Sequence, residues 1–223
     1  MSSYRIVAVN VGKPAELRHQ GKPVPSGICK SPVAQPVYLS CAGFEGDGQA
    51  DLVNHGGPDK ALCVYIWDHY PHWERVLGRC LEPGAFGENL TVSGFRESDV
   101  RIGDTFRLGD ALVQISQPRQ PCFKLAARYQ RESMPAEVAQ TGYTGFYLRV
   151  LEEGVVDPAG AVLEPVGTDP QGMTVAEAHA IMYFRKTDKD AIRKLLAVDA
   201  LAQSWRQTLE RRLARLEAEP PQG

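Results

Sequence analysis

The 223-residue chain lacks most marks of an exported or membrane-embedded protein. No apolar run approaches the roughly 20 residues that a membrane-spanning helix needs. Residues 1–10 also lack the long apolar region and the small-residue cleavage site of a signal peptide. The five cysteines are scattered without a CxxC pair, which disfavours a disulfide framework and a structural zinc site. We therefore expect a cytoplasmic protein that associates with no membrane.

The chain also lacks a charge excess. Its 25 Lys and Arg residues and 27 Asp and Glu residues give a net charge of −2, so no broad basic face for a nucleic-acid polymer is indicated. The hydrophobic share of 43% is typical of a soluble globular protein with a sizeable core. The 21 glycines and 16 prolines favour many turns and short strands over a helical bundle.

Short apolar segments with turn residues between them predict a β-rich first domain over residues 1–166. The clearest pair of strands flanks Gly109 and Asp110, a two-residue hairpin turn of the type that needs glycine first. Many short strands of this kind predict a barrel or a sandwich. The predicted strands are residues 5–11, 33–40, 61–66, 104–108, 111–116, 146–151 and 161–165, and the predicted helices are residues 70–77, 123–129 and 135–141.

From residue 174 the pattern becomes helical. Thr174 and Glu177 have the spacing of a capping box that opens a helix to about Phe184. A second helix is predicted to begin at Thr187, and leucines at helical spacing up to Leu216 predict a third. A three-helix unit over residues 174–217 is too small to be stable alone, so we expect it mainly to pack on the first domain, with contact to a partner as an alternative.

The segment around Cys122 is the most informative for chemistry, because it places a cysteine between a strand and a helix. Pro118 cannot continue a strand, and Pro121 is favoured at the opening of a helix. The helix dipole and the neighbouring Arg119 and Lys124 then favour the thiolate of Cys122. Such a thiolate is a nucleophile or a soft metal ligand. The alternative is a small buried core residue, which is the fate of most free cysteines.

Two glycine-containing segments are weaker candidates for ligand binding. In residues 46–61, glycines let backbone N–H groups approach an anion, and His55 and Lys60 add positive charge. The alternative is a plain turn into the next strand. That interpretation is favoured, because a single glycine-rich loop is a weak indication of a ligand site. In residues 84–92, Asn89 is a candidate donor to a heterocycle, and the alternative is a tight turn.

In this order, the segments resemble the MOSC family, named for the C-terminal domain of molybdenum-cofactor sulfurase, and most closely its YiiM-like bacterial branch. The resemblance covers nearly the whole chain, including the three-helix tail. It implies a mixed β-rich fold, namely a MOSC-type β-barrel with a few inserted helices plus a small C-terminal three-helix appendage. It is carried by Gly46–Asp51, His55–Lys60, Gly87–Leu90, Gly103–Asp104 and Pro118–Cys122.

The resemblance also implies a cofactor. Family members bind molybdopterin, the molybdenum cofactor, with a single cysteine on the metal, and Cys122 matches that position. Pyridoxal phosphate, which the sulfurase uses in a separate domain, is not expected, because the chain has no fold for it. The other candidate cofactor contacts are Lys30, Ser31, His55, Lys60, Asn89 and Arg119.

For the YiiM-like branch, the implied activity is reduction of N-hydroxylated compounds such as 6-hydroxylaminopurine to amines. The substrate is then a small N-hydroxylated molecule, and a separate protein donates the electrons. His55 and Asp59 are the candidate proton donors, with no ground for choosing between them. One alternative is a non-catalytic carrier of the molybdenum cofactor or its sulfur. Another is a cofactor-free enzyme that uses Cys122 as a nucleophile.

Overall fold

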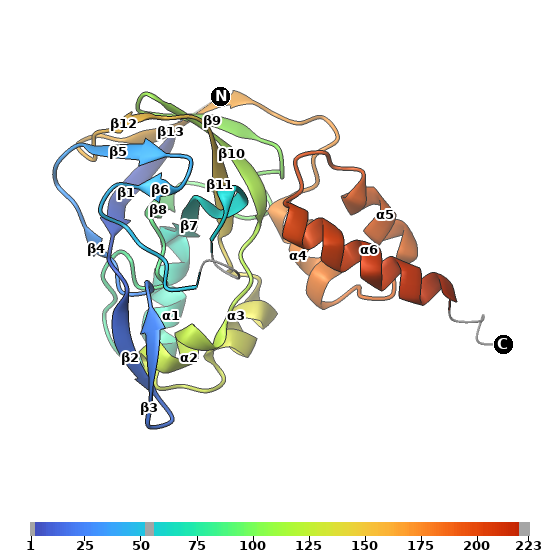
Figure 1. Ribbon diagram of the computed structural model, residues 1–223, viewed down its shortest axis with the longest axis horizontal. Helices are drawn as coiled ribbons and strands as arrows, with labels where there is room; N and C mark the ends of the chain where they lie inside the picture. Colours follow the sequence, from blue (N-terminus) through green and yellow to red (C-terminus); the bar gives the residue numbers. More distant parts are fainter. Residues whose placement is uncertain (1–2, 52–55, 219–223) are drawn as a thin grey trace.

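The computed structural model describes residues 3–51 and 56–218, which form a β-barrel with inserted helices and a C-terminal helical unit (Figure 1). None of the helices in these residues combines the length and the apolar character needed to cross a bilayer. The strands are β1 (Tyr4–Val11), β2 (Ala15–His19), β3 (Lys22–Ser26), β4 (Ser31–Pro32), β5 (Val37–Ser40), β6 (Gly43–Phe44), β7 (Leu62–Ile66), β8 (Leu90–Ser93), β9 (Thr105–Leu108), β10 (Ala111–Pro118), β11 (Phe146–Glu152), β12 (Gly154–Val156) and β13 (Val162–Gly167). The helices are α1 (Tyr70–Leu77), α2 (Phe123–Tyr129), α3 (Met134–Thr141), α4 (Val175–Tyr183), α5 (Lys189–Leu196) and α6 (Gln203–Ala218), with two 3-10 helices, η1 (Pro58–Lys60) and η2 (Trp67–His69).

Seven strands close into a barrel because the first strand pairs with the last. The hydrogen-bonded order is β13-β9-β10-β11-β7-β8-β1, and β1 returns to β13 with Tyr4 opposite Leu163. These neighbours are antiparallel except β7 and β8, which run parallel with Val64 opposite Leu90. Closure gives each of these strands two neighbours, so none is left as an unpaired edge. The expected β-barrel is confirmed.

Strand β7 separates the barrel core from the region that holds the site. All five of its residues are buried, and successive side chains point to opposite faces. Leu62 and Val64 belong to the main apolar core. Tyr65 belongs instead to a second cluster with Tyr70 and Trp73 of α1. Cys63, on the same face as Tyr65, therefore points away from the barrel core.

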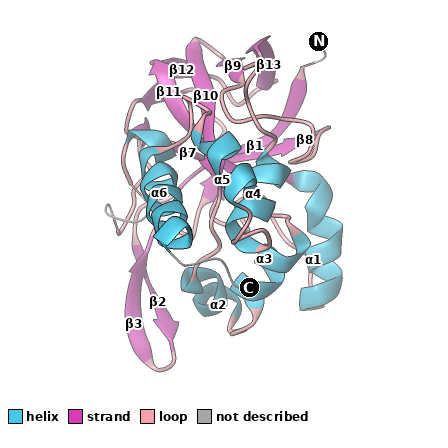
Figure 2. Cartoon of the chain, turned by 90° about the vertical axis from the view of Figure 1, so that its right-hand side faces the viewer, coloured by secondary structure: helices cyan, strands magenta, loops and turns pink. Residues whose placement is uncertain are grey.

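The C-terminal helices pack on the barrel through a shared apolar core. Val175 and Leu209 of these helices lie in the same buried cluster as Ile115 of β10, and Figure 2 shows the three helices against one side of the barrel. So small a unit gains its stability from this contact, as the sequence predicts. The division into domains of residues 1–166 and 174–217 stays a prediction.

Local sequence also predicts how the C-terminal helices begin. The Thr174 hydroxyl accepts from the Glu177 N–H, and the Glu177 carboxylate accepts from the Thr174 N–H, so the expected capping box is present. The second helix begins one residue later than expected. Asp188, not Thr187, accepts from the Ala191 N–H, in line with the stronger capping preference of Asp.

The strand predictions were wrong at residues 33–40 and missed several short strands. Residues 33–40 are not one strand, because β4 ends at Pro32 and β5 begins only at Val37. Pro36 precedes β5 and has no N–H to give to a strand pair. Strands β2, β3, β6, β8 and β12 were not predicted. Strand β8 begins at Leu90, at the end of the segment 84–92, which reads as a turn.

Candidate functional site

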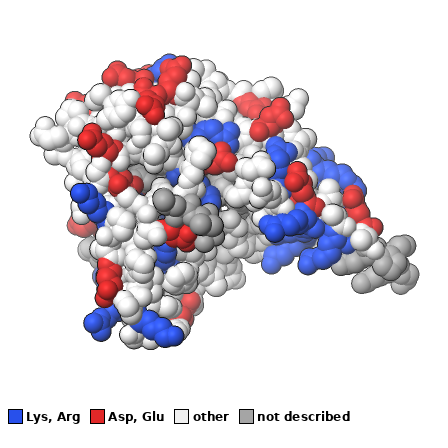
Figure 3. Space-filling view, in the orientation of Figure 1, with Lys and Arg blue, Asp and Glu red and all other residues white. Residues whose placement is uncertain are grey.

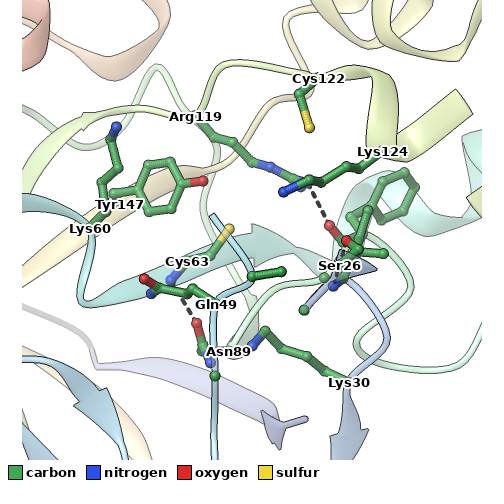
Figure 4. A pocket seen from close by; sticks show the side chains of 16 residues that line it. Ser26, Lys30, Gln49, Lys60, Cys63, Asn89, Arg119, Cys122, Lys124 and Tyr147 are labelled. Atoms are coloured by element: carbon green, nitrogen blue, oxygen red, sulfur yellow. Dashed lines mark hydrogen bonds between the residues drawn. The ribbon is translucent and has the colours of Figure 1, made fainter. Parts of the chain in front are cut away.

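A polar cavity opens between the barrel and α2, and Cys122 lies on its wall (Figure 4). The space between its walls amounts to about 540 Å³, with open solvent at its mouth included. In the view of Figure 3, Lys and Arg side chains lie near the middle of the molecule with acidic side chains beside them. Within the described chain, the lining holds cations and thiols but no carboxylate. The lining residues are Ser26, Gly27, Ile28, Lys30, Gly48, Gln49, Ala50, Lys60, Cys63, Phe86, Gly87, Asn89, Arg119, Cys122, Lys124 and Tyr147.

Cys122 occupies the strand-to-helix junction that the sequence predicts. Strand β10 ends at Pro118, α2 begins at Phe123, and Cys122 caps the helix in an extended conformation with φ −128° and ψ 167°. The thiol is half-buried and points into the cavity above Arg119 and Lys124 (Figure 4). The thiol is thus accessible from the cavity, which distinguishes it from a fully buried core cysteine.

Two cations face the cavity without a carboxylate partner. Nη2 of Arg119 donates to the Phe86 carbonyl at 2.6 Å, whereas Nη1 is buried and has no hydrogen-bond partner in residues 3–51 and 56–218. Lys124 is also buried, and its ammonium forms no ion pair within the same residues. Burying an uncompensated charge is costly. The cavity therefore favours an anionic ligand at this wall.

Lys30 also lines the cavity, but its charge is balanced from behind. Its ammonium pairs with Asp47, and both side chains are buried. The Asn89 amide donates to the Asp47 carboxylate at 2.8 Å and to the Asn10 carbonyl at 3.3 Å, while its Oδ1 accepts from the Cys63 N–H at 3.1 Å. Both donor hydrogens of Asn89 are thus used within the protein. These contacts do not support the expected role of Asn89 as a donor to a ring.

Asp59 and Lys60 are neighbours in η1 but face different regions. Lys60 lines the cavity, where burial lowers the pKa of its ammonium. The Asp59 carboxylate faces the C-terminal helices, where Arg149 Nη2 lies 2.7 Å away and the Gln203 N–H donates to it at 2.9 Å. Gln203 is the first residue of α6, so Asp59 caps that helix from the barrel. This position does not support Asp59 as a proton donor in the cavity.

The remaining predicted contacts are not all part of the cavity wall. Ser31 is exposed in β4 opposite Val11 and does not line the cavity. His55 lies outside the described residues. The cavity brings together the others, namely Lys30, Lys60, Asn89, Arg119 and Cys122.

Two lining residues, Cys63 and Tyr147, were missed by sequence reasoning. They lie opposite each other in the β7–β11 pair, so the register places both side chains on the face away from the barrel core. Burial raises the pKa of Cys63 to about 11 and also raises that of Tyr147. Arg119 lies close enough that Cys63, Tyr147 and Cys122 raise its pKa, although burial alone would lower it. Cys63 and Tyr147 therefore keep their protons at neutral pH.

Glu88 shapes the wall opposite Cys122. Its carboxylate is fully buried and accepts from the N–H groups of Gly84 and Phe86, each at 2.9 Å, and from the Tyr70 hydroxyl. These bonds hold the loop in the turn that presents Phe86 and Gly87 to the cavity. Glu88 is thus a positioning residue for this wall.

Two glycines allow the loops on the β3 side of the cavity to touch. A Cβ atom on Gly27 would lie 2.2 Å from the Gly48 carbonyl oxygen, so no larger residue fits there. Arg128 joins the same wall to the next loop by donating to the carbonyls of Ile28 and Gly84, the latter at 2.9 Å. Three separate segments are in this way fixed around one cavity.

Comparison with known proteins identifies the family to which this architecture belongs. The MOSC domain model matches residues 51–163, and the model of a YiiM-like, 3-alpha helix domain matches residues 173–216. The chain belongs to the MOSC domain family. The predicted membership of its YiiM-like branch is confirmed by both matches and by the relatives described next.

Relatives of this MOSC protein extend along nearly the whole chain. "Uncharacterized protein YflK" of Bacillus subtilis is 52% identical over 213 residues, which are 96% of each chain. The crystal structure of YiiM from Geobacillus stearothermophilus has a TM-score of 0.81 at 41% identity and covers 94% of this chain and 99% of that one. A protein named "Reductase" from Gibberella moniliformis is 38% identical over 138 residues, which are 60% of this chain but 24% of the fungal protein. That relative therefore carries much additional chain beside the shared region.

Proposed function

We propose that this MOSC protein binds the molybdenum cofactor through Cys122 and reduces N-hydroxylated compounds to amines. The expected substrates are bases similar to 6-hydroxylaminopurine, and a separate protein donates the electrons. The observation that carries the proposal is an accessible thiol that shares one cavity with Arg119 and Lys124, two cations without a carboxylate partner in residues 3–51 and 56–218. Membership of the MOSC family and the relative named "Reductase" support it.

The donor groups in the cavity fit a pterin-based molybdenum cofactor. Such a cofactor brings a phosphate and two sulfurs on the metal, so the protein must supply an anion site and one more soft ligand. Nη1 of Arg119 is a buried donor without a partner in the described chain, and together with Lys124 it suits an anionic oxygen. The described residues contain no cluster of three His, Cys, Asp or Glu side chains that could hold a metal ion. A metal in this cavity would therefore depend on ligands from the cofactor.

In this proposal the protein holds and orients the cofactor. Cys122 would bind the metal, while Arg119 and Lys124 would hold the anionic part. Lys30 adds N–H donors but little net charge, because Asp47 neutralises it. When bound, the cofactor supplies the two-electron chemistry that cleaves an N–O bond.

Tyr147 is well placed to provide a proton in the cavity. Conversion of an N–OH group to an amine takes two electrons and two protons and releases water. The Tyr147 hydroxyl points toward the middle of the cavity near Arg119 (Figure 4), and burial raises its pKa, so it is protonated at neutral pH. We infer that its Oη donates a proton to the departing oxygen. Asp59, the proton donor that the sequence suggested beside His55, instead accepts from the Gln203 N–H at the junction with α6.

The test compares wild type with Cys122→Ser and with Cys80→Ser as the matched control. Cys80 is exposed and does not line the cavity. Each protein is made in a host that synthesises the cofactor, and its molybdenum, its pterin and its reduction of 6-hydroxylaminopurine by a reduced viologen dye are measured. We expect Cys122→Ser to lose the metal and at least about a hundredfold in rate, and Cys80→Ser to behave as wild type.

Three outcomes would contradict all or part of the proposed function. Full molybdenum content and activity in Cys122→Ser would contradict the role of that thiol. Wild type that binds the cofactor without reducing any N-hydroxyl compound would favour the carrier function. Wild type that holds neither molybdenum nor pterin would rule out both.

A further inference from the structure

An apolar groove lies beside the cavity, between α3 and α4. It is formed by Pro121, Ala136, Ala139 and Gln140 on one side and by Tyr183 and Phe184 on the other. Figure 2 shows α3 and α4 next to each other at this place, and a hydrogen bond between His179 and the Ala139 carbonyl joins them. None of the groove residues in the described chain is charged. This lining contrasts with the cationic cavity only one residue away.

The α4 side of the groove is a set of packed rings. His179 is buried and stacks on Tyr183, with ring centres 4.6 Å apart and an angle of 30°. It also meets Phe184 edge to face at 5.7 Å and 75°. Its Nε2 bonds to the Ala139 carbonyl at 2.7 Å, which fixes the imidazole in place. Phe184 is nevertheless 60% exposed, so a large part of its ring is free to contact a ligand.

The groove borders the chain segment that carries the proposed catalytic thiol. Pro121 lies on its wall, and the next residue, Cys122, lies on the wall of the cavity. Tyr183 is near the Gln120 side chain and near Cys122. Burial raises the pKa of Tyr183, and the proximity of Cys122 raises it further, while Gln120 lowers it. A ring bound in the groove would therefore lie beside the segment that carries Cys122.

We propose that this groove binds the flat, uncharged heteroaromatic ring of the substrate and places its N–OH group toward Cys122. The proposal rests on the proposed reductase function and adds a recognition site to it. Exposed aromatic faces favour a planar ring, since stacked or edge-to-face rings gain free energy beyond the burial of area. The absence of charge in the described lining disfavours ionised ligands, which would lose their hydration without gaining a partner. Gln140 offers an amide that can bond to ring nitrogens.

The assignment also gives the C-terminal helices a part in the reaction. Tyr183 and Phe184 end α4, so the three-helix unit supplies one wall of the groove, while α3 of the first domain supplies the other. Ligand sites commonly form at such boundaries between domains. The helices would then bind substrate as well as pack on the barrel.

The test uses the cofactor-loaded protein and two kinds of measurement. Adenine, a flat uncharged ring without an N–OH group, is titrated by calorimetry, and KM and kcat are measured with 6-hydroxylaminopurine and with hydroxylamine, which has no ring. For Phe184→Ala we expect the adenine Kd and the KM for 6-hydroxylaminopurine to rise about three- to tenfold, as loss of one aromatic contact predicts. The kcat, and all constants for hydroxylamine, should stay unchanged. Phe184→Trp should restore the ring affinity.

Val166→Ala is the matched control, because Val166 is 59% exposed on β13 and does not line the groove. It should leave all constants unchanged. The proposal is overturned if wild type does not bind adenine, or if Phe184→Ala leaves both the adenine Kd and the KM unchanged. It is also overturned if Phe184→Ala changes only the oligomeric state, since the groove would then be covered by a second copy. Failure of wild type to reduce 6-hydroxylaminopurine would refute the proposed function, and the adenine titration would still decide whether the groove binds a ring.

Discussion

The two regions on either side of η1, the junction with α6 and the cavity, differ in whether their charged side chains are paired. At the junction with α6, Asp59 pairs with Arg149, which also donates to the Ala200 carbonyl at 2.8 Å. In the cavity on the other side, Nη1 of Arg119 and the ammonium of Lys124 find no partner in the described chain. At the junction the charges of Asp59 and Arg149 are paired within the fold, whereas these two cavity cations are not paired within the described residues. The difference separates the charges that hold the molecule together from those that are available to a ligand.

The unpaired cations of the cavity therefore contribute little to the stability of the folded protein. A buried cation without a partner loses hydration and gains no ion pair, so it lowers the stability of the empty protein. Residues arranged for function commonly carry such a cost. The comparison predicts that cavity variants lose ligand binding before stability, and that junction variants do the reverse.

The largest effect is expected for Arg119→Met. Removing this buried cation should weaken retention of the molybdenum cofactor about a hundredfold, as loss of charge-assisted bonds to an anion predicts. The free energy of unfolding of the cofactor-free protein should change by no more than about 1 kcal/mol, because the loss of one hydrogen bond to a carbonyl is offset by removal of a buried unpaired cation. Pterin analysis and urea denaturation measure the two quantities. The control is Arg107→Met, because Arg107 is an exposed barrel arginine whose ion pair is also exposed. A large loss of stability with intact cofactor binding in Arg119→Met would show that Arg119 stabilises the fold and does not bind the cofactor.

A smaller effect is expected for Tyr147→Phe. If its hydroxyl donates a proton, kcat for N-hydroxyl reduction should fall at least about tenfold while the molybdenum content stays unchanged. Steady-state kinetics on protein of known metal content measures this. Tyr38→Phe, an exposed tyrosine that bonds to Glu153, should have no effect, and an unchanged kcat in Tyr147→Phe would exclude the proton-donor role.

At the junction, Asp59→Ala should lower the free energy of unfolding by about 2 kcal/mol. The variant removes the acceptor at the start of α6 and leaves Arg149 without its carboxylate. Urea denaturation measures the loss, and kcat per folded molecule should stay unchanged. Asp199→Ala, an exposed acid close to the same helix, should change stability by less than about 0.5 kcal/mol. A collapse of kcat in Asp59→Ala would restore Asp59 as a proton donor.

The smallest effect concerns the pH dependence of stability. The pKa of Cys63 is raised from its usual 9.0 to about 11 in the folded protein. Between these values the unfolded chain releases the proton first, so this thiol stabilises the fold below pH 9 and the contribution is lost as pH rises toward 11. Between pH 8.5 and 10.5, wild type should lose about 1–2 kcal/mol more than Cys63→Ala does. Equal losses in the two proteins would mean that the thiol is not buried as described, and Cys80→Ala serves as the exposed control.

Sequence reasoning succeeded where the physics is local. Proline at positions 118 and 121 predicted that Cys122 stands between a strand and a helix, and the helix over residues 123–129 agrees with α2. The capping box at Thr174 was equally readable. These features depend on bonds within a few residues, which the chain specifies directly.

It failed where the outcome depends on pairing across the barrel. Nothing near Tyr147 in the sequence indicates that it meets Cys63, because their contact follows from the β7–β11 register. The same holds for Asp59, whose partners Arg149 and Gln203 lie about 90 and 144 residues further along the chain. Such contacts are set when distant strands and helices come together.

By itself, the sequence determined the family, the β-rich architecture and the position of one cysteine between a strand and a helix, since motif order and proline positions are properties of the chain alone. The tertiary structure decided which side chains share the cavity with Cys122 and which ones instead join the barrel to the C-terminal helices. It also built a groove from two helices that neither helix contains. The reason is that burial and the pairing of charges belong to the packed molecule, and adjacent residues such as Asp59 and Lys60 acquire different roles only when the chain around them has folded.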